Sequence, residues 1–365
     1  MRRIYLIRHG RPDLPEQEKW CLGRTDSGLG VLGRMQACIL GSVMREMELN
    51  AVFCSPLSRS MQTAAYISNA PIVLSGLREQ DFGQWDGLSF AQIRAEWPRL
   101  YEARGTDRTL LPPEAEPFEM ARTRFLKAVQ TALEQSEGDI ALVTHQSVMG
   151  LFLGSILDED LQECCRHRFA YGSVTVLEYE EKVPQKGSAP WRLCRADQFP
   201  APVLNEALCR SLLREAELPE EVIAHCALVA ELVRQFCSEL AASGYELDAP
   251  LAVCSGWLHD LARTRPSHAQ TAANWLYQLG YAEAAEIVGQ HHALLHPNRL
   301  DEAAIVCLAD CCAEGSRQVT LAQRFAKSRE KCRSEDALRA HRRRYEEVLF
   351  LKEQLNRQCG KEVVL

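Results

Sequence analysis

The chain has 365 residues, of which 46% are hydrophobic and 25% charged, and its formal net charge is -7. This length exceeds what one hydrophobic core usually serves, so we expect two domains. The acidic charge argues against a nucleic-acid-binding surface, and no apolar run is long enough to span a bilayer. The 15 cysteines lack the paired Cys-x-x-Cys spacing of a zinc site. We therefore expect free thiols, a cytoplasmic location, and neither a nucleic-acid nor a membrane partner.

The N-terminal segment combines a buried strand with polar side chains at its end. Residues 4–7 are apolar, and Arg8, His9 and Gly10 follow at once. A short apolar run bounded by a turn signal is typical of a central parallel strand, and α/β sheets bind ligands at the carboxyl ends of such strands. We therefore predict that His9 lies in a binding crevice beside Arg8.

Two further apolar strands, residues 51–54 and 139–144, also lead into polar side chains. Arg59 follows the first of them at the start of a predicted helix, and His145 follows the second directly. Helix N-termini favour anions, so Arg59 should face the same crevice as the first strand's end. Polar residues 182–190 predict a hairpin that joins the last two strands of this sheet.

These side chains form a sensible set for moving a phosphoryl group. A neutral imidazole such as that of His9 can attack phosphorus, and guanidinium groups bind phosphate oxygens bidentately. His145 would stabilise the transferring group. Glu79, in a loop-like segment, would protonate the leaving oxygen and then take a proton from the attacking water. This scheme needs no metal ion or other cofactor.

With these motifs the first half resembles the histidine phosphatase superfamily, also called phosphoglycerate-mutase-like. The resemblance covers residues 1 to about 197 and has four ordered blocks: Arg8-His9-Gly10, Ser55-Pro56-Leu57-x-Arg59-x-x-Gln62-Thr63-Ala64, Leu77-x-Glu79-x-x-Phe82-Gly83-x-Trp85-x-Gly87 and Thr144-His145. It implies an α/β fold whose mostly parallel sheet is flanked by helices. It also implies that His9 is the phosphorylated nucleophile, that Arg8, Arg59 and His145 form the phosphate pocket, and that Glu79 is the acid.

The substrate implied is a small phosphorylated metabolite. Trp20, Arg24 and residues 99–118 lie between the motifs, and we expect them to contribute to substrate binding. The compact spacing between Glu79 and His145 favours a phosphatase. A phosphoglycerate-mutase-type phosphotransferase stays open as an alternative.

Past Phe199-Pro200-Ala201-Pro202 strand patterns vanish and helical periodicity takes over. We place the domains at residues 1–199 and 204–330, followed by a charged, solvated helical tail over 331–365. In the second domain His225 lies on the border of an apolar helix face, and residues 251–262 read as a buried helix. Ser267 and Gln270 predict a capping box that opens the helix containing His268.

Three polar side chains of this half, His259, Asp260 and Asp310, lie in segments with almost no polar neighbours. Unpaired buried carboxylates are costly, so these groups need a shared counter-charge. Histidine nitrogens together with carboxylate oxygens suit divalent manganese, iron or zinc. The pattern therefore predicts a metal centre.

This half resembles the HD phosphohydrolase superfamily over roughly residues 204–330, which implies an all-α bundle. The metal ligands implied by that resemblance are His225, His259, Asp260 and Asp310. His268 and His291 match the additional histidines of a two-metal subgroup that includes members acting on nucleotides, and His292 is a weaker substitute for His291. One or two divalent ions and a nucleotide-like phosphate ester follow from the resemblance.

The whole sequence thus indicates a bifunctional phosphohydrolase. Its first domain would carry a metal-independent phosphohistidine site and its second domain a metal-dependent site. An alternative makes the HD half a non-catalytic nucleotide sensor that regulates the phosphatase. Nucleotide turnover separates these two interpretations.

Overall fold

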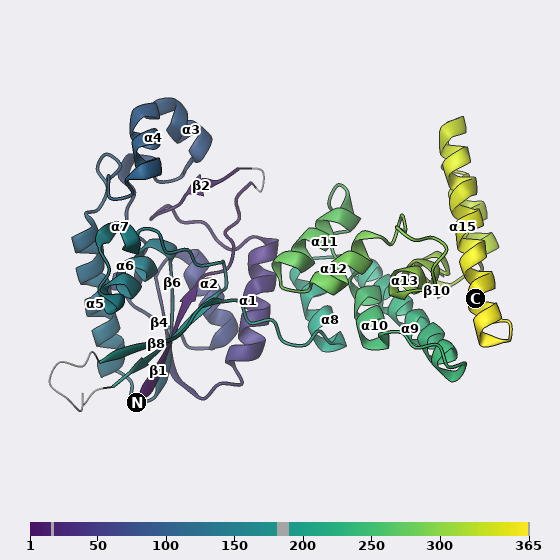
Figure 1. The fold of residues 1–365 in the computed structure, drawn as a ribbon, viewed down its shortest axis with the longest axis horizontal. Coiled ribbons are helices and arrows are strands. Elements are labelled where there is room, and N and C mark those ends of the chain that lie inside the picture. The colour runs from purple at the N-terminus through teal and green to yellow at the C-terminus, as the bar shows by residue number, and fades with distance from the viewer. Residues whose placement is uncertain (16–17, 181–189, 364–365) are drawn as a thin grey trace. The chain divides into compact units, whose positions relative to one another are not determined.

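The structure is a computed structural model that describes residues 1–15, 18–180 and 190–363. The chain divides into two compact units, Met1–Pro202 and Val203–Leu365, each described here by itself (Figure 1). Among the described residues no helix has the length and apolarity needed to cross a membrane.

The first unit contains a six-stranded sheet in the order β4-β3-β6-β1-β7-β8. Its strands are β1 (Arg2–Arg8), β3 (Leu49–Cys54), β4 (Ile72–Val73), β6 (Asp139–Thr144), β7 (Val174–Tyr179) and β8 (Trp191–Gln198). The first four strands run parallel, while β7 and β8 pair antiparallel at one edge. The mostly parallel sheet predicted from the apolar runs is confirmed. The predicted hairpin between β7 and β8 falls on residues 181–189, which lie outside the described residues.

Helices cover both faces of this sheet (Figure 1). On one face Ile4 and Leu6 of β1 pack in a core with α5 (Phe118–Glu134) and α6 (Gln146–Leu157), and on the other Tyr5 and Ile7 pack in a core with α1 (Val31–Met44) and α2 (Ser58–Ile67). Successive residues of a strand point to opposite faces, so a continuous apolar run is what a doubly covered strand requires. The helices of this unit are α1 (Val31–Met44), α2 (Ser58–Ile67), α3 (Phe90–Glu96), α4 (Pro98–Thr106), α5 (Phe118–Glu134), α6 (Gln146–Leu157) and α7 (Leu161–Cys164).

A small subdomain adds to the sheet. The strands β2 (Trp20–Cys21) and β5 (Leu88–Ser89) pair antiparallel, and α3 and α4 pack around a separate small core that contains Trp85. A Ser89 capping box begins α3, which fixes where the chain turns from strand to helix. Short 3-10 turns lie at Ser75–Leu77 and Gly83–Trp85.

The second unit is helical apart from one short two-stranded ribbon, as predicted. Its elements are α8 (Glu206–Glu215), α9 (Glu220–Ala242), α10 (Ala249–Leu258), α11 (His268–Gln278), α12 (Ala282–Gly289), α13 (Glu302–Cys311), β9 (Ala313–Glu314), β10 (Arg317–Gln318), α14 (Leu321–Arg329) and α15 (Glu335–Cys359). The acids at the start of α9 and the proline before it are favourable at a helix N-terminus.

Two local predictions in this unit are wrong. The expected helix over residues 251–262 ends earlier, because α10 stops at Leu258 and the chain turns through His259 and Asp260. Ser267 does precede α11, but it lies in the left-handed region at φ 47° and its side chain caps no backbone N–H. The sequence has the residue types of a capping box, but the Ser267 backbone lacks the extended conformation that the motif needs.

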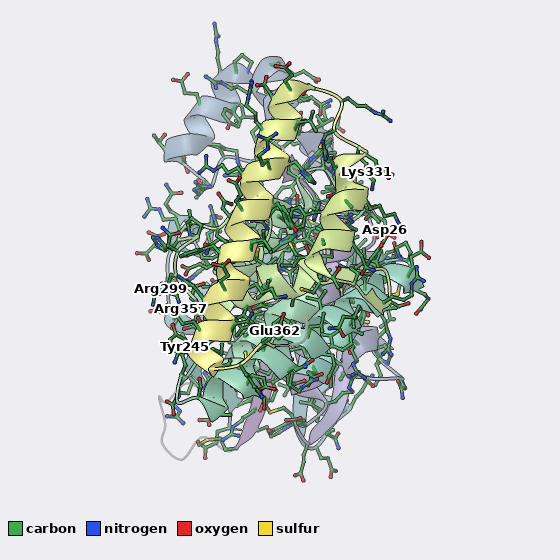
Figure 2. The ribbon with its side chains drawn as sticks, turned by 90° about the vertical axis from the view of Figure 1, so that its right-hand side faces the viewer. Asp26, Tyr245, Arg299, Lys331, Arg357 and Glu362 are labelled. Carbon is green, nitrogen blue, oxygen red and sulfur yellow. The ribbon has the colours of Figure 1, made fainter. Side chains whose placement is uncertain are left out.

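The C-terminal helix α15 is more than a solvated tail. Its residues Val348, Leu351 and Leu355 are fully buried, at the spacing of one helix face. Phe325 of α14 packs against Tyr345, with ring centroids 4.7 Å apart, so the two helices form an antiparallel pair with Lys331 near the turn (Figure 2).

Candidate functional site

The first candidate site lies where β1 and β6 end. The two strands pair in parallel with Arg8 opposite Thr144, so the residues that follow each strand meet at one edge of the sheet. The backbone N–H of His9 donates to the carbonyl of Thr144 at 3.1 Å. The rings of His9 and His145 have centroids 4.9 Å apart. The register of two buried strands therefore brings two distant histidines together.

His9 is held as a neutral imidazole with a defined tautomer. Its Nδ1 lies 2.7 Å from the carbonyl oxygen of Gly10, which only accepts, so Nδ1 carries the proton. Nε2 is thus unprotonated and lies 3.2 Å from the Nε of Arg59. Burial, followed by the charges of Arg59 and Arg8, lowers the pKa of His9 well below its ordinary value of 6.5. Nε2 has the lone pair that a nucleophile needs.

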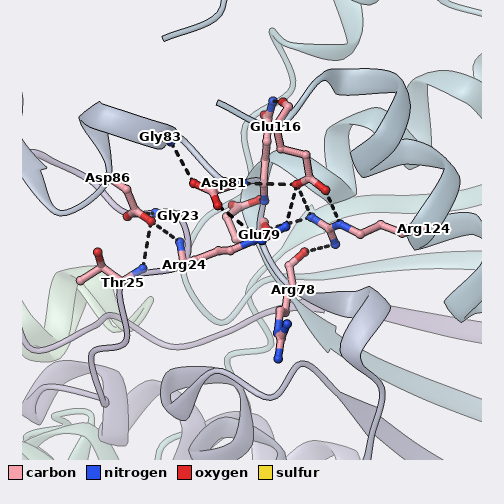
Figure 3. A network of polar contacts seen from close by, with 11 residues as sticks. Gly23, Arg24, Thr25, Arg78, Glu79, Asp81, Gly83, Asp86, Glu116 and Arg124 are labelled. Carbon is pink, nitrogen blue, oxygen red and sulfur yellow. Dashed lines mark hydrogen bonds and ion pairs between the residues drawn. The ribbon is translucent and has the colours of Figure 1, made fainter. Parts of the chain in front are cut away.

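Arg59 is fully buried at the start of α2 and is fixed by a loop. Its two terminal nitrogens donate to the carbonyls of Thr25 and Gly23 at 2.9 and 2.6 Å. The carboxylate of Asp86 in turn accepts the backbone N–H groups of Gly23, Arg24 and Thr25 at 2.8, 2.6 and 3.0 Å (Figure 3). Together with the contact from Nε to His9, these bonds use three of the five guanidinium N–H groups of Arg59. Two N–H groups are then left for a ligand.

Arg8 and His145 complete the cationic side of the site. The Arg8 guanidinium stacks 3.7 Å from the ring centroid of Tyr171 and donates to the carbonyl of Phe169. The Nε2 of His145 lies 2.8 Å from the hydroxyl oxygen of Ser55. Within the described residues, the buried Nε of Arg8 and Nδ1 of His145 make no hydrogen bond. Buried polar atoms are rarely left this way, so both are candidates for contact with a ligand.

Glu79 is a buried carboxyl group at the N-terminus of α6. Its oxygens accept N–H groups from Gln80, Ser147 and Val148 at 2.8, 3.0 and 3.3 Å. Burial raises the pKa of Glu79 above its ordinary value of 4.5, although these hydrogen bonds oppose the shift. A carboxyl group with a raised pKa is suited to general acid catalysis.

The segment that carries Glu79 is clamped by Arg124 of α5. The Arg124 guanidinium donates to the carbonyls of Gly76, Arg78 and Glu79 at 2.9, 2.7 and 2.9 Å. It also forms a bidentate pair with Glu116, at 2.7 and 2.8 Å (Figure 3). The sequence analysis missed Arg124, because it belongs to no motif block and acts through backbone carbonyls.

A cavity of about 610 Å³ is lined by Arg8, His9 and Glu79 among others, and Arg59 and His145 each contact the His9 ring. Arg24, which we expected to bind substrate, does not line this cavity. Its guanidinium instead lies 3.4 Å from Asp81 and 3.3 Å from Glu116 (Figure 3). A role of Arg24 in substrate binding therefore stays a prediction, and these two carboxylates would compete for its charge.

The second candidate site gathers histidines and carboxylates from several helices of the second unit. His225 of α9, His259 after α10 and Asp310 of α13 present ligand atoms within 4.8 Å of one another. The same holds for His268, which begins α11, and for the two residues that follow α12, His291 and His292. These two trios are sets of the kind that hold divalent transition metals.

Asp260 lies between the two trios. Its Oδ2 is 3.6 Å from the Nε2 of His259, and its Oδ1 is 3.2 and 4.0 Å from the Nε2 atoms of His268 and His291. Asp260 lies in the turn that follows α10. All six sequence-predicted ligands are therefore close together, and His292 joins them.

The donor chemistry of this cluster fits bound cations. In the described chain the buried His259 Nε2, Asp260 Oδ1 and His291 Nε2 atoms have no hydrogen-bond partner. The Nδ1 atoms of His259 and His291 lie 2.8 and 2.7 Å from the carbonyls of Gly256 and Val288, which fixes the protons there. The bare Nε2 lone pairs then face the cluster, as in histidines that bind metal.

Comparisons with known proteins agree with this division. The profile of the histidine phosphatase superfamily (branch 1) matches residues 4–188, and the HD domain profile matches residues 222–315. The bifunctional protein Rv2228c of Mycobacterium tuberculosis is 30% identical over 183 residues, which are 48% of this chain and 50% of that protein. Human 6-phosphofructo-2-kinase/fructose-2,6-bisphosphatase 1 is 29% identical over 165 residues, which are 44% of this chain and 34% of that protein.

The solved structure of mycobacterial hydrolase 2 aligns with a TM-score of 0.50 and 25% identity, and covers 59% of this chain and 97% of its own. The chain spans about half, or less, of the length of the curated relatives named above. The two profile matches together with the strand-edge geometry settle the family. The chain belongs to the histidine phosphatase superfamily and carries an HD domain in its second unit.

Proposed function

We propose that this protein is a bifunctional phosphohydrolase, with a phosphohistidine-dependent phosphomonoesterase in the first unit and a metal-dependent phosphohydrolase in the HD domain. The observation that carries the first activity is the meeting of Arg8, His9, Arg59, Glu79 and His145 beside one cavity. Nucleophile, acid and anion-binding groups are then all within the reach of one phosphate ester.

In the first step the Nε2 of His9 forms a bond to phosphorus while the bond from phosphorus to the ester oxygen breaks. The protonated Glu79 carboxyl gives its proton to the leaving oxygen, and an alcohol departs. The Nδ1–H of His9 continues to donate to the Gly10 carbonyl. This hydrogen bond orients the ring and stabilises the positive charge that develops on it. Phosphorus is then held on His9 as a phosphohistidine.

In the second step water attacks phosphorus and the bond to Nε2 breaks. The Glu79 carboxylate takes the proton from that water, which restores the acid, and inorganic phosphate is released. Throughout, the Arg8 and Arg59 guanidinium groups and the His145 ring stabilise the charge on the phosphoryl oxygens. This cycle uses only side chains of the first unit.

The pKa shifts set the expected pH dependence of kcat/KM. His9 reacts when neutral, so activity rises with pH through the His9 pKa, which lies below 6.5. Glu79 acts when protonated, so activity falls as pH rises through its raised pKa, above 4.5. Glu79→Gln should remove the alkaline limb and lower the plateau. An acid limb centred at or above 6.5 would contradict the assignment.

Asp86 is expected to act as a positioning residue. Asp86→Ala removes the acceptor of three N–H groups in the loop whose carbonyls hold Arg59. We expect a loss of up to about 10²-fold in kcat/KM, because small displacements of a positioned group are costly. The exposed carboxylate of Asp13 provides the control, and Asp13→Ala should retain activity. Unchanged kinetics in Asp86→Ala would refute this role.

For the HD domain, we propose that His225, His259, Asp260, His268, His291 and Asp310, with His292, hold one or two divalent ions of manganese, iron or zinc. When bound, such ions supply Lewis-acid stabilisation of charge on phosphate oxygens. The residues present their bare Nε2 atoms and carboxylate oxygens to the same place. By the family resemblance, the proposed substrate is a nucleotide-like phosphate ester.

Arg344 of α15 is expected to position a ligand of this centre. Its guanidinium donates to the backbone carbonyl of His291 at 2.7 Å. We expect Arg344→Ala to weaken Mn²⁺ binding by roughly 10–100-fold, the usual cost of losing an outer partner of a ligand. Arg343 is the matched control, since it lies on the same helix, is 81% exposed and pairs with Glu347. Titration calorimetry with Mn²⁺ on both variants decides, and equal affinities would refute the role.

One panel of phosphomonoesters and nucleotides tests the whole proposal, assayed with and without chelator on wild type, His9→Ala and Asp260→Ala. Phosphomonoester hydrolysis should survive chelation and disappear in His9→Ala, while nucleotide hydrolysis should show the opposite pattern. One activity lost equally in both variants would refute two independent sites. Tight nucleotide binding without turnover would favour the sensor alternative, and transfer of phosphate to an acceptor alcohol would favour the phosphotransferase.

A further inference from the structure

The cavity that contains His9 is much larger than a phosphoryl group. Its volume of about 610 Å³ lies in the range of sites for complete small-molecule ligands. Most of its lining comes from residues that the phosphoryl chemistry does not use. The character of those residues therefore reports on the remainder of the substrate, provided that the proposed phosphatase function holds.

One part of this lining is aromatic. Six aromatic side chains face the cavity, namely Trp20, Phe82, Trp85, Phe90, Tyr101 and Tyr171. They come from the small subdomain and from the loop before β7. Aromatic rings offer flat apolar surfaces that favour stacking with other rings. The substrate should therefore carry a planar or ring-containing body next to its phosphate.

A second part of the lining is a group of three arginines, Arg104, Arg108 and Arg168, which we call the arginine trio. Arg104 donates to the carbonyl of Leu110, and Arg168 donates to the carbonyls of two neighbouring residues. Within the described residues none of the three forms an ion pair with a carboxylate. Carbonyl partners fix the direction of a guanidinium without neutralising it, although the charge of the Asp107 carboxylate also acts on Arg104.

The surroundings of the arginine trio add to this charge imbalance. A smaller cavity of about 230 Å³ is also lined by these three arginines. The arginine trio therefore lies between this cavity and the larger one. Burial, followed by the charge of Arg108, lowers the pKa of Arg168. Among the residues that the structure describes, the larger cavity is lined by five basic side chains and by two acidic ones, Glu79 and Glu102, in a chain whose net charge is -7. Arg104 and Arg108 are half-buried and Arg168 is exposed, and like charges gathered at one place favour the binding of an anion.

We propose that the phosphatase substrate carries a second anionic group, a carboxylate or another phosphate, which binds the arginine trio while its ring-containing body lies on the aromatic side chains. The scissile phosphate occupies the His9 end of the same cavity. Selectivity then comes from residues that sequence motifs do not identify.

The test compares three aryl esters that share one leaving-group ring: phenyl phosphate, carboxyphenyl phosphate and phenylene bisphosphate. Carboxyphenyl phosphate and phenylene bisphosphate each carry a second anionic group. In wild type we expect kcat/KM for at least one of these two esters to exceed that for phenyl phosphate by roughly tenfold to hundredfold, the range of a charge-assisted hydrogen bond. Which of the two is preferred identifies the anion as carboxylate or phosphate. The preference should decline at high salt.

Arg108→Ala and Arg168→Ala should bring this preference ratio close to one. Arg94→Ala is the matched control, because Arg94 is an exposed arginine of α3 outside the cavity lining, and it should keep the wild-type ratio. A wild type that hydrolyses all three esters through His9 without preference would overturn this inference alone. Turnover that survives in His9→Ala would overturn the proposed function itself.

Discussion

His9→Ala is expected to lower kcat/KM for phosphomonoesters by on the order of 10⁴-fold or more, the scale seen when a covalent nucleophile is removed. The reason lies in the surroundings of this ring. Its Nδ1 is bonded to the Gly10 carbonyl and its Nε2 faces Arg59 at 3.2 Å, so no other described nucleophile of the site has the same lone pair, charge state and orientation. Steady-state assays in the presence of chelator isolate this activity from the HD domain.

Two controls make this result interpretable. Arg94→Ala, at an exposed arginine of α3, should retain wild-type kcat/KM. The His9→Ala protein should also keep its full metal content, because the two compact units each have their own site. Retention of more than about one per cent of phosphomonoesterase activity in His9→Ala would contradict covalent catalysis through this residue.

Asp310→Ala is expected to abolish metal binding by the trio that this residue forms with two histidines. The Asp310 carboxylate lies 3.1 Å from His225 Nε2 and 3.7 Å from His259 Nε2, so its loss removes the anionic ligand that the two histidines share. The loss of affinity should exceed the roughly 10–100-fold expected for an outer partner. Metal analysis of the purified variant by mass spectrometry measures it.

Thermal unfolding gives an independent measure of the same change. A ligand present at a hundred times its Kd stabilises a fold by about 2.7 kcal/mol, which raises Tm by several degrees in a domain of this size. Wild type should show this increase when Mn²⁺ is added, and Asp310→Ala should not. His296→Ala, an exposed histidine of the same unit, should behave as wild type. An unchanged metal content in Asp310→Ala would remove this residue from the centre.

Much of the fold could be predicted from the sequence, because strong local patterns specify it. The apolar run before His9 is what a strand covered on both faces requires, and the parallel register then brings His145 beside it. The metal cluster could be anticipated for a similar reason. Asp310 lies in an otherwise apolar helix, and such a carboxylate needs a counter-charge.

Other features depend on long-range contacts that no local pattern reveals. Arg124 reaches three carbonyls of the Glu79 segment from a different helix, and Arg344 reaches the His291 carbonyl from α15. Such contacts to backbone atoms place no constraint on the partner's side chain, so the sequence carries no paired signal. The ion pairs of Arg24 are of the same kind, because its acidic partners come from later segments of the chain.

The most direct measurement is detection of the phosphorylated enzyme. The protein is mixed with a phosphomonoester, the reaction is quenched rapidly without acid, and the peptides are analysed by mass spectrometry. We expect one acid-labile phosphoryl group on the peptide that contains His9, absent from His9→Ala and longer-lived in Glu79→Gln. A phosphoryl group on another residue, or steady turnover with none on His9, would contradict the central claim.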